Sequence, residues 1–158
     1  MKLKKFVLIV ATLLVMPVAG FTSGEHGMDH SKMDTENLGM STDGKMIMLG
    51  MHEVDGVKGF AHLNDVRIQM AEHGMNETHH IMVAFEDVAT GDAIESGVVA
   101  VKVEDPDGNI SEPIKLSGMD GHFGVDLTLD KKGMYHFKVG TKLADGKKRT
   151  FHHHFENN

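Results

Sequence analysis

The chain has 158 residues, a formal net charge of −7 at pH 7, 12 His, 13 Met and no Cys. The lack of Cys excludes disulfide bonds, thiol nucleophiles and thiolate metal ligands. The acidic balance disfavours binding to nucleic acid or to an anionic membrane, and it favours binding of cations.

Residues 1–20 have the pattern of a secretory signal peptide. Three Lys residues precede an apolar stretch at 6–16, and small residues at 18–20 offer a cleavage site. The apolar stretch is shorter than the roughly 20 residues that a membrane-spanning helix needs. We therefore predict a cleaved signal and a periplasmic or secreted protein, with an uncleaved membrane anchor as the alternative.

Residues 21–43 are rich in Gly, Ser, Thr, Asp and Met and have no sustained apolar periodicity. This composition predicts a disordered N-terminal tail. The tail is either a flexible metal-collecting arm or an inert linker, and the sequence leaves both open. Its potential metal ligands are His26, Met28, His30, Met33 and Met40.

Residues 44–158 predict one β-strand-rich domain. Short apolar segments at 46–51 and 56–63 are typical of strands, and a short helix is expected between Asp65 and Gly74. Residues 78–86 alternate, with His80 and Met82 on one face of the expected strand. Further strands are expected at 99–103, 110–116, 123–129 and 135–139, and a last one at 151–155.

Six to eight short strands at a spacing of roughly 8–12 residues favour an antiparallel β-sandwich or a small barrel. The segment 130–135 ends in the only Tyr of the chain, and its spacing is typical of a tyrosine corner. We therefore predict an all-β, immunoglobulin-like antiparallel β-sandwich. Tyr135 should be buried, with its hydroxyl bonded to backbone near 130–133.

No catalytic constellation is present in the sequence. There is no phosphate-binding Gly-rich loop before a helix, no His-Glu-x-x-His zinc helix and no nucleophile elbow. The acidic pairs at 86–87 and 104–105 stand at strand ends, where solvated turn acids are the usual explanation. We do not expect an enzyme.

Three clusters of His and Met could bind a metal ion. The segments 78–82 and 118–122 both stand at strand beginnings, so we expect their side chains to meet at one site, and the segment 151–155 is the second candidate. Each residue also has an ordinary explanation, as a solvated surface His or a core Met. The candidate ligands are His79, His80, Met82, Met119, His122, His152 and His154.

Thioether sulfur and imidazole nitrogen together favour copper over harder ions. Imidazole suits Cu(II), and added Met would stabilise Cu(I). Zinc or nickel bound by His and carboxylates is the weaker alternative, because such sites do not need Met.

The turn 105–108 and the segments 118–124 and 130–135 resemble those of the bacterial YtkA-like/FixH-like group of extracytoplasmic immunoglobulin-like domains. That group is similar in architecture to CopC-type periplasmic copper carriers. The resemblance covers roughly 75–156, and it implies a non-catalytic role in copper handling or oxidase assembly. CopC-type proteins use a His at the mature N-terminus, whereas the expected mature chain begins with Phe21, so their ligand set does not carry over.

The sequence thus predicts a periplasmic metal-binding protein, a copper carrier or buffer with His and Met ligands. A membrane-bound copper transporter or an oxidase assembly partner is the expected protein partner, and no nucleic acid is expected. The alternative is a non-catalytic structural or assembly module for a membrane partner such as an oxidase complex.

Overall fold

A computed structural model describes residues 45–158. The predicted signal peptide (1–20) and tail (21–43) lie outside these residues. Within the described part, no helix is long and apolar enough to cross a membrane.

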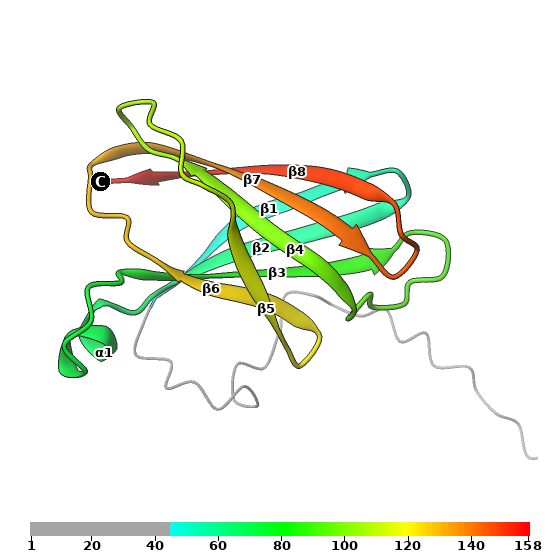
Figure 1. Cartoon of the computed structure of the whole chain (residues 1–158), viewed down its shortest axis with the longest axis horizontal. Coiled ribbons are helices and arrows are strands. Elements are labelled where there is room, and N and C mark those ends of the chain that lie inside the picture. The colour runs from blue at the N-terminus through cyan, green and yellow to red at the C-terminus, as the bar shows by residue number, and fades with distance from the viewer. Residues whose placement is uncertain (1–44) are drawn as a thin grey trace, which may run out of the picture. The chain divides into compact units, whose positions relative to one another are not determined.

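The described chain is built almost wholly of antiparallel strands (Figure 1). The elements are β1 (Met46–Val54), β2 (Val57–Asp65), α1 (Arg67–Glu72), β3 (His79–Asp87), β4 (Gly97–Glu104), β5 (Ile114–Met119), β6 (His122–Leu127), β7 (Gly133–Leu143) and β8 (Lys148–Asn157). The predicted strand at 110–116 begins later, at Ile114, because Ser111 instead accepts a hydrogen bond from the Val103 backbone N–H through its hydroxyl.

The strands follow the order β1-β2-β3-β6-β5-β4-β7-β8. β5 joins two layers, because residues 114–116 pair with β4 and residues 117–119 pair with β6. Strands β2, β3, β6 and β5 follow the order A, B, E, D of an immunoglobulin sandwich, and β4, β7 and β8 follow C, F, G. The predicted all-β sandwich is therefore confirmed, with β1 as an added strand beside β2.

The core lies between the two layers and is formed by alternate residues of each strand. Phe85 stands at its centre, with ring centroids 5.8 Å from Phe123 and 5.3 Å from Phe151. Because side chains alternate across a strand, the neighbours of these residues in sequence face outward. This alternation decides which of the candidate ligands face outward and which face the core.

Tyr135 forms the predicted tyrosine corner at the start of β7. Its side chain is 2% exposed, and its hydroxyl accepts a hydrogen bond from the Lys131 backbone N–H at 2.9 Å. The corner fixes the crossing from the β6 layer to the β7 layer.

Candidate metal centre

The outer face of the β1-β2-β3-β6 layer carries several His and Met side chains. Leu63, Ile81 and Val83 belong to the core, so the residues that alternate with them face the other way. These outward residues are His62 on β2 and His80 and Met82 on β3.

Strand register brings these side chains into neighbouring rows. Met48 pairs with His62, His62 pairs with Met82, and Met82 pairs with Gly124. Directly paired residues on one face have Cβ atoms roughly 4.5–5.5 Å apart. One row across four strands therefore holds two thioethers, one imidazole and one position without a side chain.

The β5–β6 hairpin adds two more candidate ligands to this face. Asp120 (φ 40°) and Gly121 (φ 83°) both have the positive φ that a tight two-residue hairpin requires. This turn sets Met119 directly opposite His122. Because Phe123 points into the core, both face outward.

His80 is oriented as a metal ligand would be. Its Nδ1 lies 2.6 Å from Asp126 Oδ1, and a carboxylate only accepts, so the ring proton of neutral His80 is on Nδ1. Nε2 then carries a lone pair, and this atom is buried without a hydrogen-bond partner in residues 45–158. Metal-bound His residues commonly hold a carboxylate on the second ring nitrogen in this way.

His62 is held neutral beside His80 and His122. Its side chain is 7% exposed, and its Nε2 is also buried without a partner in the described chain. Burial, followed by the nearby His122 and His80, lowers the pKa of His62 to about 4. The His62 and His122 ring centroids are 6.4 Å apart. A neutral imidazole is the form that binds metal.

Met82 is buried and pairs with His62 in the strand register. Met82 is 2% exposed, and its Sδ lies 4.0 Å from Asn64 Nδ2. Met48 and Met119 lie at the edges of the same face and are 63% and 39% exposed. The buried thioether of Met82 is thus the central sulfur donor of the cluster.

Among residues 45–158, no three His, Asp or Glu side chains are already placed to hold one ion. A centre on this face must therefore include the Met82 sulfur, or must draw in His122 by a side-chain rotation. His122 is only half-buried, and its Nδ1 lies 3.1 Å from the Asp120 carbonyl oxygen. We define the outer-face cluster as His62, His80, Met82 and His122.

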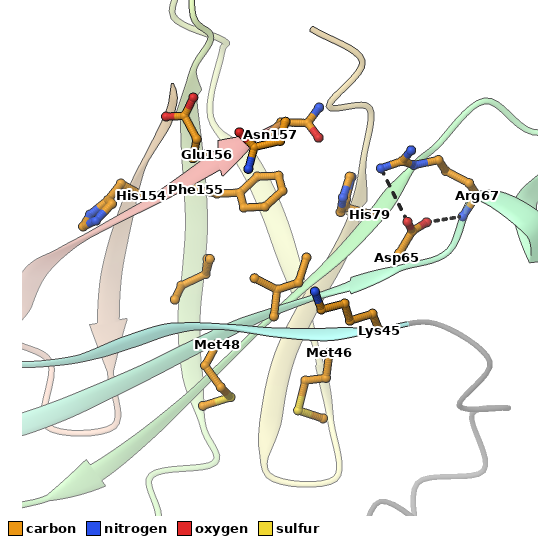
Figure 2. A pocket seen from close by; sticks show the side chains of 13 residues that line it. Lys45, Met46, Met48, Asp65, Arg67, His79, His154, Phe155, Glu156 and Asn157 are labelled. Atoms are coloured by element: carbon orange, nitrogen blue, oxygen red, sulfur yellow. Dashed lines mark hydrogen bonds and ion pairs between the residues drawn. The ribbon is translucent and has the colours of Figure 1, made fainter. Parts of the chain in front are cut away.

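The structure separates His79 from this cluster. His79 faces the core, where Thr78 Oγ1 lies 2.8 Å from its Nδ1 and the Phe155 ring centroid lies 5.4 Å away. Figure 2 shows His79 and Phe155 on one side of β1, with Met46 and Met48 pointing away on the other. Among the predicted ligands, His80, Met82, Met119 and His122 share one face, and His79 does not.

His152 and His154 are also separate from the outer-face cluster. They lie exposed on β8, beside Lys138 and His136 of β7. Their layer is the opposite one, so they cannot complete a site with His80.

Sequence reasoning missed His62, a member of the outer-face cluster, and Asp126, which holds His80 Nδ1. The segment 56–63 predicts only a strand, although a His between Ala61 and Leu63 is an outward residue flanked by core residues. That pattern was the available signal, but the pairing of His62 with Met82 and of His80 with Asp126 depends on register.

No family model matches the chain, and no curated protein matches it. A solved structure of a DUF4426 family protein from Pseudomonas aeruginosa PAO1 is similar, with a TM-score of 0.52 and 12% sequence identity. The similarity covers 68% of this chain and 94% of that one. At this identity the likeness shows a shared β-rich fold.

Proposed function

We propose that the protein is a copper carrier or buffer that binds the ion at the outer-face cluster. The single observation that carries this proposal is the pair of buried Nε2 atoms, on His62 and His80, without partners in the described chain. Met82 is the register partner of His62 and lies two residues from His80 on β3. A buried nitrogen left without a partner costs about 1–3 kcal/mol. A bound ion would remove this cost at both rings.

The donor types favour copper among the transition metals. Imidazole nitrogen suits Cu(II) and zinc, and thioether sulfur adds selectivity for Cu(I). Zinc would gain little from Met82. A site with both donor types and no thiol suits copper handling in an oxidising compartment.

A carrier role fits the carboxylate beside the cluster. Asp126 is hydrogen-bonded to His80, so it orients a ligand instead of serving as a free base. The predicted signal peptide would deliver the protein to the periplasm or cell exterior. The resemblance to the YtkA-like/FixH-like group supports the same role, with a membrane-bound copper transporter or oxidase assembly factor as the recipient.

The test is competition of the purified mature protein against chromophoric chelators of Cu(I) and Cu(II), together with zinc titration. The variants are His62→Gln, His80→Gln, Met82→Leu and Met82→Leu with Met119→Leu. Leu conserves volume and apolarity, so folding should survive with a modest loss of stability. Met70→Leu on α1 is the matched control.

We expect each His variant to weaken the tightest copper site at least tenfold, a change of about 1.4 kcal/mol. The Met variants should lose Cu(I) affinity far more than Cu(II) or zinc affinity, and Met70→Leu should match wild type. Unchanged Cu(I) affinity in both His80→Gln and the double Met variant would refute the copper site.

A structural or assembly module remains the second candidate, favoured by a groove of about 480 Å³ between β1 and the end of β8. Figure 2 shows Phe155 and His79 in this groove. If the protein is such a module, the Met variants would retain biological function. A charged substitution at Ile47, which lines the groove, would abolish that function.

A further inference from the structure

The first and last strands of the sandwich meet at an open seam. β1 pairs with β2, and β8 pairs with β7. Within the described chain no hydrogen-bonded ladder joins β1 to β8, although the two strands contact each other. Side chains at this seam must supply any cross-link between the two layers.

A β-bulge in β1 turns His52 toward the seam. The register shifts between Met48 and Gly50, and Gly50 has φ 94°. Before the bulge, Met48 pairs with outward-facing His62; after it, His52 pairs with Gly59, on the core side of β2. The bulge thereby redirects His52 from the outer-face cluster to β8, a common role of bulges.

His153 meets His52 from the other side of the seam. The two ring centroids are 5.1 Å apart with an interplanar angle of 77°. His153 is 2% exposed, and neither ring nitrogen makes a well-formed hydrogen bond in residues 45–158, although the Leu49 backbone lies near. Burial, followed by His52, lowers the pKa of His153 to about 4, so the ring is neutral.

Further imidazoles line the groove beside this pair, on the outward face of β7 and β8. His136, His152 and His154 line the same groove of about 340 Å³ as His52 and His153. Direct register pairing brings His136 opposite His154. The other lining residues are Glu104 and Lys138, which form a 3.8 Å ion pair, so the groove has no thioether.

We propose that His52 and His153 form a second metal site, for a borderline divalent cation such as Zn(II), that ties β1 to β8. His52 and His153 are the two donors that face each other across the seam; a third imidazole, from His152 or His154, would have to come around the edge of β8, because alternation places these two on the other face of the strand. All-imidazole donors suit Zn(II) and Cu(II), whereas Cu(I) is favoured by the thioether that this groove lacks. This seam site shares no residue with the outer-face cluster, so an experiment can refute one of the two sites without refuting the other.

Metal binding at the seam should stabilise the fold, because the ion would bridge two strands that no ladder joins. A ligand that binds only the folded state raises the melting temperature with its concentration. If His residues of β8 alone bound the metal, the rise in melting temperature would not depend on His52.

The test uses the full mature chain carrying His80→Gln and Met82→Leu, which disables the outer-face cluster. Zn(II) is titrated by calorimetry, and melting temperature is followed as Zn(II) rises. His52→Gln is added to this background, because His52 is exposed and its loss should not prevent folding. His73→Gln, at the exposed C-cap of α1, is the matched control.

We expect His52→Gln to lower the affinity of one Zn(II) site at least tenfold and to abolish the Zn(II)-dependent rise in melting temperature. His73→Gln should change neither. An equal Zn(II) affinity and thermal shift in the His52→Gln protein would overturn the seam site. The seam site would also be overturned if the double variant His152→Gln, His154→Gln lost Zn(II) binding while the His52→Gln protein kept its Zn(II) affinity.

Discussion

The Nε2 atom of His80 occupies the space that a side chain at Gly124 would need. A β-carbon built at position 124 would lie 2.5 Å from His80 Nε2 and 3.2 Å from the Ile81 carbonyl oxygen. Gly124 thus leaves room for the imidazole to lie across β6, on the face where Met82 and His122 stand.

Gly124→Ala should therefore displace the His80 ring without removing any ligand. We expect copper affinity to fall at least tenfold and the free energy of unfolding to fall by about 1–3 kcal/mol from overpacking. Chelator competition and urea unfolding measure the two effects. Gly118→Ala is the control, because its β-carbon would come no closer than 3.8 Å to the Phe123 ring. Equal copper affinity in the two variants would argue against a ligand role for His80.

Removing the carboxylate that orients His80 should weaken copper binding. Asp126→Ala takes away the partner of Nδ1, so the ring is free to rotate or to change tautomer. Loss of such a partner typically costs about 10–100-fold in metal affinity. Chelator competition gives the value, with Asp92→Ala, in an exposed turn, as the control. A loss no greater than that of Asp92→Ala would place Asp126 outside the site.

Tyr135→Phe should destabilise the domain by about 1–3 kcal/mol, because the Lys131 backbone N–H loses its acceptor in a half-buried corner. Urea unfolding at constant m-value measures the change. Copper affinity should stay at the wild-type level, since Tyr135 belongs to the core and supplies no ligand to the outer-face cluster. An unchanged midpoint would show that water replaces the hydroxyl without cost.

The metal-free protein should lose stability as the pH falls from about 6.5 to about 4. Burial lowers the pKa of His62 and of His153 to about 4, and it also lowers the pKa of His79. The unfolded chain, with His near 6.5, therefore binds more protons than the folded chain in this window, so acid favours unfolding. The stabilisation is fully present above pH 6.5.

His62→Gln should flatten this dependence by up to about 1.4 kcal/mol per pH unit, the limit for one proton. Urea unfolding in the presence of a chelator, at several pH values between 4 and 7, measures the slope. His73→Gln should keep the wild-type slope. A His62→Gln slope equal to wild type would mean that His62 takes up its proton over the same pH range in the folded and unfolded chains.

Much of the fold follows from the sequence because strand alternation and turn residues are local signals. The alternation at 78–86 places His80 and Met82 on one face, and the single Tyr at 135 marks the corner between layers. Both features hold in the structure. The start of β5 was misplaced because a Ser111 hydroxyl replaces a ladder contact there, and side-chain competition of this kind has no periodic signature.

The arrangement of the outer-face cluster could not be predicted from the alternation of residues along each strand. Period two fixes the face of each residue within its own strand, but the neighbours across strands depend on which strands pair and in which register. Only the fold could bring His62 beside Met82, Asp126 onto His80 and Gly124 beneath the imidazole. One extra residue at the β1 bulge likewise sends His52 to β8 and away from His62, because each shift of one residue exchanges the two faces of a strand.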